Sequence, residues 1–298
     1  MPHLTPTTSI LRSEADLERL RAFIKELPDK PSINNFEEHM GIQANRACTR
    51  LWQRGDQVIA FAYVDTFNNL YFEIHPNHRS EALDGEIVKW GLSCVRRRNE
   101  ETDATSTLDA ACDTTDTERL AFLERFEFTR EPVRSLKYSR SLDEQIEIVP
   151  FPPGFTVRSV TGESEVDALV ALHRAAFGTE NMTVEERLAI MHAPNYVPEL
   201  DLVAVAPDGE LSAFCVCELE GAGDSTVGFT DPIGTHPRHW RLGLGRAILS
   251  AGLVALKERG AVRAELGTSS ENFSMQRLAE RMGFTCVAEK LWFSKEVV

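Results

Sequence analysis

The sequence lacks several features that would assign it to a membrane, secreted or metal-binding class. No apolar run reaches the roughly 20 residues that a membrane span requires. The first 20 residues contain no basic region followed by an apolar core, so they do not predict a secretory signal. The six cysteines show neither metal-ligand spacing nor the pattern of a disulfide framework. We therefore expect a protein of the reducing cytoplasm, with no membrane segment and no metal site.

An excess of basic side chains is also missing. The chain has 32 Lys and Arg against 46 Asp and Glu, a net charge of −14. This balance argues against a nucleic-acid partner and suits a cationic or amine-bearing one, although acidity that merely aids solubility explains it equally well. The length of 298 residues suggests one large domain or two of about 150 residues. The oligomeric state cannot be read from these numbers.

The chain repeats itself. A strand-like run leads into His-Pro-x-His and then into a helical pattern twice, once at His75 and once at His236. Three further pairs of segments match in the same order, namely 11–13 with 157–159, 116–128 with 272–284, and 136–140 with 291–295. The repeat predicts two copies of one fold, and it favours a turn-forming role for the two histidines over a catalytic one.

The proline-rich stretch 141–154 marks the expected boundary between the copies. We accordingly expect domains at 1–145 and 146–298. In the second copy, Pro207-Asp208-Gly209 predicts a hairpin, and helical patterns cover 244–259 and 274–284. The expected class is α+β, with each copy a mixed, mostly antiparallel sheet flanked by helices.

A glycine-rich loop carries the clearest chemical signal. Gly243-Leu244-Gly245 opens a helix, where backbone N–H groups and the helix dipole favour an anion such as pyrophosphate. A Walker A loop would require Lys and then Ser or Thr after the last glycine, but Arg246 and Ala247 follow Gly245. A dinucleotide fingerprint would require a third glycine, where the chain has Ile248.

In context, the second copy resembles the GNAT superfamily of acetyl-CoA-dependent N-acetyltransferases. Its motif A, a strand, a turn and a Gly-x-Gly helix start, matches Thr235-His236-Pro237 and Gly243-Leu244-Gly245. Its motif B, an Asn followed by a helix that ends in Gly-Phe, matches Asn272 and Gly283-Phe284. The resemblance covers 155–298 and, more faintly, 8–140. Tandem copies with a degenerate first half resemble the mycothiol synthase-like tandem acetyltransferases of bacteria.

The resemblance implies acetyl-CoA as co-substrate, a small amine as acceptor and direct attack of that amine on the thioester. Backbone groups of Ile233, Gly234 and Thr235 would pair with the pantetheine arm, and Asn272 would help to position the cofactor. The pyrophosphate would be held by the amides of Trp240, Arg241, Leu242, Gly243, Leu244, Gly245 and Arg246.

Two positions depart from the family pattern. Trp240 stands where the family has Gln or Arg, so a side-chain contact with pyrophosphate must come from Arg238, Arg241 or Arg246. Ala279 stands where many members have the tyrosine that protonates the departing thiolate. Water, Ser274 or Tyr196 could replace that tyrosine, and the sequence does not distinguish among them.

Asp231 is the candidate base. It precedes the motif A turn on the strand beside the thioester, where a branch of the superfamily typified by serotonin N-acetyltransferase has a basic histidine. A carboxylate there could remove a proton from an ammonium directly or through water. A solvated aspartate at the end of a strand is an equally good interpretation.

The first copy is expected to lack a cofactor site. Alignment on the two His-Pro pairs places Ala82 at Gly243, Asp84 at Gly245 and Glu81 at Leu242. Asp116 stands at Asn272, a further unfavourable change. The departures in the second copy leave one alternative open, a non-catalytic module that binds acyl-CoA for regulation.

Overall fold

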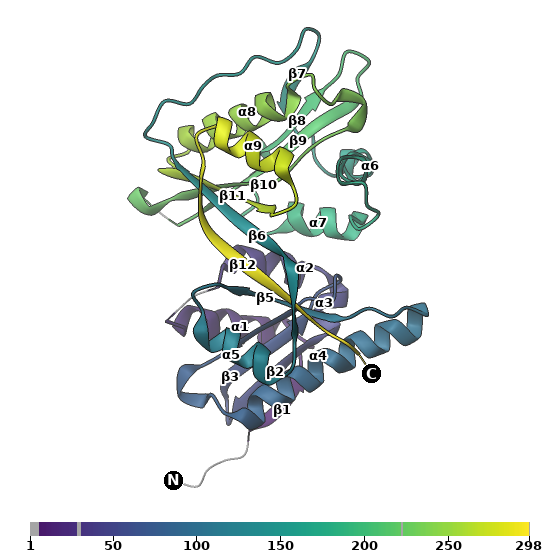
Figure 1. Ribbon diagram of the computed structural model, residues 1–298, viewed down its shortest axis with the longest axis vertical. Coiled ribbons are helices and arrows are strands. Elements are labelled where there is room, and N and C mark those ends of the chain that lie inside the picture. The colour runs from purple at the N-terminus through teal and green to yellow at the C-terminus, as the bar shows by residue number, and fades with distance from the viewer. Residues whose placement is uncertain (1–5, 29–30, 222, 298) are drawn as a thin grey trace. The chain divides into compact units, whose positions relative to one another are not determined.

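The computed structural model describes residues 6–28, 31–221 and 223–297. The chain forms two compact units (Figure 1). Unit 1 contains the described residues up to Arg134 together with those from Lys290 onward, and unit 2 contains Ser135–Glu289. These limits differ from the expected division at 145/146, because the last strand of each copy crosses into the other unit.

The predicted repeat is visible in the order of the elements. The first copy runs β1 (Thr7–Ile10), α1 (Glu14–Glu26), α2 (Ile33–Gly41), α3 (Gln43–Ala47), β2 (Thr49–Arg54), β3 (Gln57–Val64), β4 (Leu70–Ile74), α4 (Glu81–Thr102), β5 (Leu108–Asp113), α5 (Thr117–Arg125) and β6 (Thr129–Ser141). The second runs β7 (Thr156–Ser159), α6 (Val166–Phe177), α7 (Val184–His192), β8 (Asp201–Val205), β9 (Leu211–Glu220), β10 (Val227–Thr235), α8 (Leu244–Glu258), β11 (Arg263–Ser269), α9 (Phe273–Arg281) and β12 (Thr285–Lys295). Apart from the short α3, the two orders are the same.

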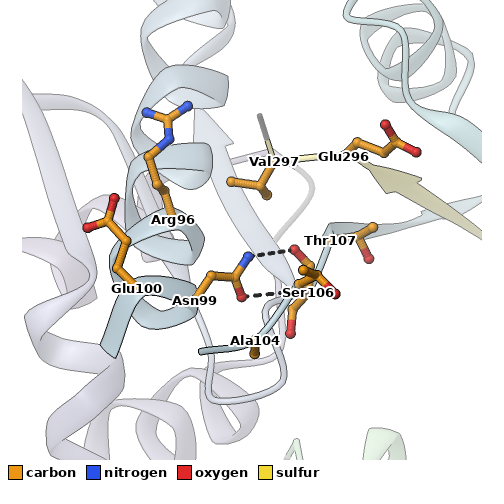
Figure 2. A pocket seen from close by; sticks show the side chains of 9 residues that line it. Arg96, Asn99, Glu100, Ala104, Ser106, Thr107, Glu296 and Val297 are labelled. Carbon is orange, nitrogen blue, oxygen red and sulfur yellow. Dashed lines mark hydrogen bonds between the residues drawn. The ribbon is translucent and has the colours of Figure 1, made fainter. Parts of the chain in front are cut away.

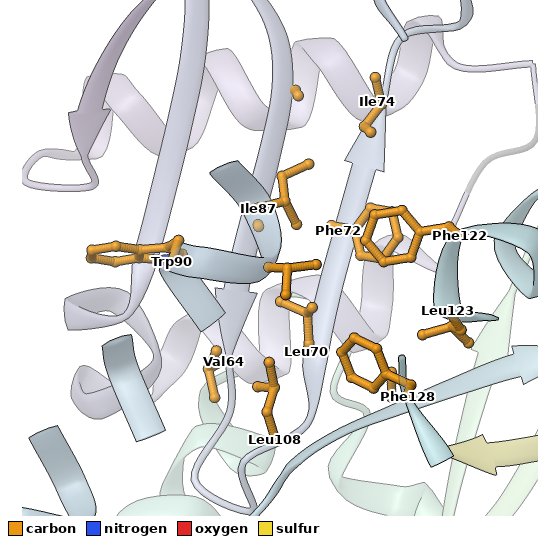
Figure 3. Close-up of a cluster of buried hydrophobic side chains, with 14 of the residues drawn as sticks. Val64, Leu70, Phe72, Ile74, Ile87, Trp90, Leu108, Phe122, Leu123 and Phe128 are labelled. Carbon is orange, nitrogen blue, oxygen red and sulfur yellow. The ribbon is translucent and has the colours of Figure 1, made fainter. Parts of the chain in front are cut away.

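Unit 1 is built around an antiparallel sheet in the order β1-β2-β3-β4. Alternate residues of β3 serve the two faces, with Phe61 and Tyr63 packing against α1 and α2. Ala60 and Ala62 point to the opposite cluster, which α4 and α5 complete. Figure 3 shows this second cluster, where Phe72 and Phe122 face each other with ring centroids 4.6 Å apart.

Unit 2 repeats these layers. Strands β7, β8, β9 and β10 form an antiparallel run, and β10 then pairs parallel with β11. Helices α8 and α9 cover one face of the sheet, while α6 and α7 cover the other. The mixed, mostly antiparallel sheet with flanking helices confirms the expected fold class.

The last strands are exchanged between the copies. In unit 2, β11 is paired on its outer side by the 135–141 segment of β6, which belongs to the first copy. In unit 1, β5 is paired by residues 290–295 of β12, which belong to the second copy. Leu291 and Phe293 of β12 are buried in the core of unit 1. Each unit is therefore completed by a strand from the other half of the sequence.

Local sequence signals stand at the ends of the helices. Thr183 and Glu186 form the capping box that starts α7, and Gly178 ends α6 in the left-handed conformation. The two repeated histidines form turns, as expected: Nδ1 of His75 accepts from Asn77 N–H at 3.3 Å, and Nδ1 of His236 accepts from Arg238 N–H at 3.2 Å. Among the helices of the described ranges, none combines the length and apolar character that a membrane crossing needs.

Candidate functional site

Strands β10 and β11 separate soon after they meet. Their parallel ladder covers only Val227–Phe229 opposite Arg263–Glu265. Beyond it, a bulge between Thr230 and Ile233 shifts the register of β10 against β9. We call the gap between the diverging strands the splay.

The backbone alternation of β10 decides which groups face the splay. His236 N–H donates to Ser212 C=O at 2.9 Å, and Gly234 lies opposite Phe214 two residues earlier in the same antiparallel ladder. In such a ladder, alternate residues bond to the neighbouring strand. The peptide groups of Ile233 and Thr235 therefore point away from β9 and toward the splay. They belong to two of the three residues that the resemblance assigned to the pantetheine arm, and the expectation for the third, Gly234, is wrong because its peptide groups face β9.

The glycine loop follows directly after β10. Gly243 adopts the left-handed conformation, with φ at +86°, and begins α8 without a side-chain cap. Its carbonyl accepts from the N–H groups of Arg246 and Ala247. In the described part of the chain, the five N–H groups of 241–245 have no acceptor. The expectation that the N–H groups of Trp240 and Arg246 also face the pyrophosphate is wrong, because they donate to the carbonyls of Pro237 and Gly243. Uncapped donors at the positive end of a helix dipole favour an anion.

Gly245 lies close to the end of β10 and to the middle of α9. A Cβ on Gly245 would lie 3.5 Å from Oγ1 of Thr235 and 3.6 Å from Cδ2 of Leu278. Asn272 is the N-cap of α9, where its Oδ1 accepts from Met275 N–H at 3.1 Å. Its side chain is exposed. All the residues of the expected cofactor site belong to unit 2.

The three candidate arginines differ in their partners. Arg238 pairs with Glu210 at 2.7 Å, and Arg246 pairs with Glu147. Arg241 makes no hydrogen bond or ion pair within the described ranges, and it holds an uncommon positive φ of 64°. Its guanidinium is therefore the one of the three that no protein carboxylate engages there.

Asp231 lies at the bulge, on the splay side of β10. Gly267 N–H, on β11, donates to its Oδ2 at 3.2 Å. The residue is open to solvent on one side, while the two strands remove much of the hydration of its carboxylate. This desolvation raises the pKa of Asp231 to about 6, against the opposing effect of the Gly267 hydrogen bond.

A second carboxylate, Glu218 on β9, was not identified from the sequence. It lies opposite Phe229 in the β9–β10 ladder, and its Oε2 accepts from Asn195 Nδ2 at 3.2 Å. Burial raises its pKa, and the negative charges of Glu220 and Asp231 raise it further, while Asn195 lowers it. Alternate residues of a strand share a face, so the sequence of β9 could have placed Glu218 on the same face as Phe214 and Val216, toward α6 and α7.

The candidates for the proton donor are separated in the structure. Tyr196 donates from its hydroxyl to Oδ2 of Asp201 at 2.7 Å, and Asp201 is buried and paired with Arg187. Burial and this carboxylate raise the pKa of Tyr196. Ser274 is exposed in the first turn of α9, two residues after Asn272. Ala279 is fully buried, so the position of the family tyrosine belongs to the core.

In unit 1 the corresponding groups are occupied. The carbonyl of Phe72, which aligns with Ile233, accepts from Arg119 Nη2 at 3.1 Å, and Glu73 pairs with the same guanidinium at 3.2 Å. The helix start is capped, because Ser80 Oγ accepts from Leu83 N–H at 3.3 Å. Asp84 points into the unit and pairs with Arg125 at 3.2 Å, so its charge is partly compensated.

The pocket of unit 1 in Figure 2 lies elsewhere. It has a volume of about 550 Å³ and surrounds the end of α4 opposite to its capped start. Asn99 spans it with two hydrogen bonds to the Ser106 backbone, of 3.0 and 3.1 Å. The pocket therefore does not lie at the helix start of unit 1 that corresponds to the Gly243 loop. The described residues contain no group of three or more His, Cys, Asp or Glu side chains placed to hold a metal ion.

Comparison with known proteins agrees with this geometry. Residues 166–284 match the model of the acetyltransferase (GNAT) family. A mycothiol acetyltransferase from Kineococcus radiotolerans is 30% identical over 226 residues, which are 74% of this chain and 70% of that protein.

Solved structures match over almost the whole length. A tandem GNAT protein from the clavulanic acid biosynthesis pathway aligns with a TM-score of 0.72 and 14% identity, covering 99% of this chain and 98% of that one. A GCN5-related N-acetyltransferase from Sphaerobacter thermophilus gives 0.65 and 21%, covering 98% and 96%. At these identities the structures establish the fold alone. With the sequence relatives, they confirm the expected family, and the chain belongs to the GNAT family as an acetyltransferase built from two GNAT folds in tandem.

Proposed function

We propose that unit 2 transfers an acetyl group from acetyl-CoA to the amine of a small molecule, and that unit 1 binds no acetyl-CoA. The observation that carries this proposal is the uncapped loop of unit 2 beside the splay-facing edge of β10, where the carbonyl of Thr235 accepts from Trp240 Nε1–H. In unit 1 the matching edge is occupied by Arg119 and the matching helix start by Ser80.

The loop and the end of β10 would bind different parts of acetyl-CoA. The N–H groups of 241–245 would hold the pyrophosphate, with the unpaired guanidinium of Arg241 as its side-chain contact. The splay-facing peptide groups of Ile233 and the N–H of Thr235 would bind the pantetheine arm, while the Thr235 carbonyl accepts from Trp240 Nε1–H. Acetyl-CoA supplies the acetyl group as a thioester, and the fixed backbone donors orient it for attack.

Two carboxylates would receive the amine. An amine is mostly protonated near neutral pH, and it must lose a proton before it can attack the thioester directly. Asp231, with its pKa of about 6, is ionised at pH 7 and placed to take that proton, directly or through water. Glu218 lies close enough for the charge of Asp231 to affect its pKa, and it would attract the ammonium. The name of the sequence relatives makes a mycothiol-related amine the first acceptor to test.

The departing thiolate would be protonated by water or by Ser274. Tyr196 is a poor donor, because its hydroxyl proton is already directed to Asp201. An ordinary thiol pKa of about 8.5 makes a dedicated acid less necessary than for an alkoxide.

Substitution at Gly245 tests the cofactor assignment. A Cβ at this position makes only ordinary contacts with Thr235 and Leu278, so Gly245→Ala should fold as the parent does. We expect at least tenfold weaker acetyl-CoA binding for Gly245→Ala and no measurable binding for Gly245→Glu, because a side chain here obstructs close approach of the pyrophosphate to the backbone.

Titration calorimetry of all three proteins gives the measurement, with thermal unfolding as the control for folding. We expect one acetyl-CoA per chain in the parent protein. Unchanged affinity in Gly245→Glu, or a stoichiometry of two, would sink the assignment. Release of CoA thiol with a panel of amines then measures the transfer itself.

A further inference from the structure

Trp240 is the residue by which the loop departs most from its family, and the structure gives it a specific contact. Its indole Nε1–H donates to the backbone carbonyl of Thr235 at 2.9 Å. That carbonyl faces the splay, since Thr235 does not bond to β9. The indole therefore ties the start of the loop back to the last residue of β10. The ring itself is 59% exposed, so burial does not account for its presence.

The loop needs such a tie. Arg241, the next residue, has a φ of +64°, which is unfavourable for any side chain with a Cβ. Gly243 has a φ of +86°, which a glycine adopts without strain. Within the described ranges, Arg241 and Leu242 make no hydrogen bond or ion pair, and Trp240 N–H bonds only to Pro237 C=O. The indole is thus the one described side chain that fixes the strained part of the loop.

We infer that Trp240 is a positioning residue, which holds Arg241 in its left-handed conformation and thereby presents the loop N–H groups to the pyrophosphate. The inference rests on the proposed function. It assigns to Trp240 an action through the backbone, in place of the direct polar contact that the family's Gln or Arg would make. When only a fraction of molecules has the competent loop, the apparent affinity falls by that fraction.

Trp240→Phe removes the indole N–H and keeps an aromatic ring. One lost hydrogen bond should reduce acetyl-CoA affinity by about five- to tenfold. Because the loop is remote from the transferred proton, we expect KM for acetyl-CoA to rise by this factor while kcat at saturation changes by less than about twofold. A merely structural role would instead lower stability and reduce the amount of active enzyme, without this split.

A comparison at Arg241 isolates the strain. Arg241→Ala and Arg241→Gly both remove the guanidinium, but only glycine also removes the conformational penalty. With Trp240 present, the two variants should bind acetyl-CoA equally within about twofold, since the indole holds the loop in both. In the Trp240→Phe background, the glycine variant should bind about fivefold more tightly than the alanine variant. Because both variants lack the guanidinium, the comparison between them needs no separate control for charge.

Titration calorimetry with acetyl-CoA and with CoA gives the affinities of all six proteins. Equal affinities for the parent and Trp240→Phe would overturn the inference, as would an alanine–glycine difference that does not depend on Trp240. If the parent binds neither ligand, the proposed function fails instead, so the two failures are distinguishable.

Discussion

At the scale of single residues, Asp231 is a candidate site residue whose pKa the fold raises. Its pKa is raised to about 6, so the folded protein holds this proton more tightly than the unfolded chain does. The contribution of Asp231 to the free energy of unfolding is therefore most favourable below the ordinary carboxyl pKa, and it falls as the pH rises toward 6. At neutral pH the ionised carboxylate is therefore available as a base at some expense in stability.

Asp231→Asn should separate these two effects. We expect kcat/KM to fall by about a hundredfold at pH 7, with the deficit shrinking above pH 9, where the acceptor amine loses its proton unaided. The melting temperature at pH 7 should be equal to that of the parent or higher by about 1–3 °C. Glu220→Gln, an equal charge change on β9, serves as the control and should alter the rate by less than about twofold. Superimposable pH–rate profiles for Asp231→Asn and the parent would retire Asp231 as the base.

At the scale of elements, one capping device recurs in both copies. Asn272 caps α9 through Met275 N–H at 3.1 Å, and Asp116 caps α5 through Arg119 N–H at 2.9 Å. The family match at Asn272 thus has a structural meaning that does not require a cofactor. The side chain of Asn272 is nevertheless exposed, so its amide group is also accessible to a cofactor.

Two substitutions of Asn272 distinguish capping from cofactor binding. Asn272→Asp keeps an N-cap acceptor, whereas Asn272→Ala loses it and should cost about 1 kcal/mol of unfolding free energy. We predict that both variants bind acetyl-CoA several-fold more weakly, although only the alanine variant is destabilised. Denaturant unfolding and calorimetry give the two readouts. If the aspartate variant keeps full affinity, Asn272 is a cap and nothing more.

Sequence patterns identified most elements, because their signals are local. The hairpin at Pro207-Asp208-Gly209, the end of α6 at Gly178 and the start of α8 all depend on residues a few positions apart. The strand exchange could not be predicted in this way. The patterns of 136–140 and 291–295 are nearly the same, and a strand's pattern of apolar residues does not specify its neighbour.

The residues of the candidate site also differ in whether a local sequence signal or only the tertiary structure reveals them. The glycine loop and Asn272 follow one another in recognisable order, so the sequence indicated that they start the helices α8 and α9. Glu218 could not be found from the sequence, because it comes near Asp231 only through the pairing of β9 with β10. The tie from Trp240 to Thr235 was equally hidden, since a tryptophan in a loop has no fixed partner in the sequence.

At the scale of the whole molecule, the exchange of last strands makes a prediction about fragments. A fragment 146–298 contains one complete copy but lacks the 135–141 segment that pairs with β11. A fragment 135–289 contains unit 2 with that segment and without the strand that unit 1 uses. An unpaired strand edge promotes association. We therefore expect 135–289 to be monomeric and to bind acetyl-CoA, and 146–298 to self-associate.

Light scattering and calorimetry on the two fragments provide the check. Fragment 146–298 would contradict the prediction if it were monomeric and as heat-stable as 135–289. In that case β12 would have taken the place of β6 beside β11, which its similar sequence permits.

The exchanged strands also bear on how a duplicated gene changes over generations. After a duplication, the copy that loses its activity ordinarily drifts until it is deleted. Here a deletion of the first copy would remove a strand from the second, because β11 would lose its partner in β6. If unit 1 binds no acetyl-CoA, as proposed, the last strand of the first copy is still required to complete the sheet of unit 2. The two halves are bound to be inherited together.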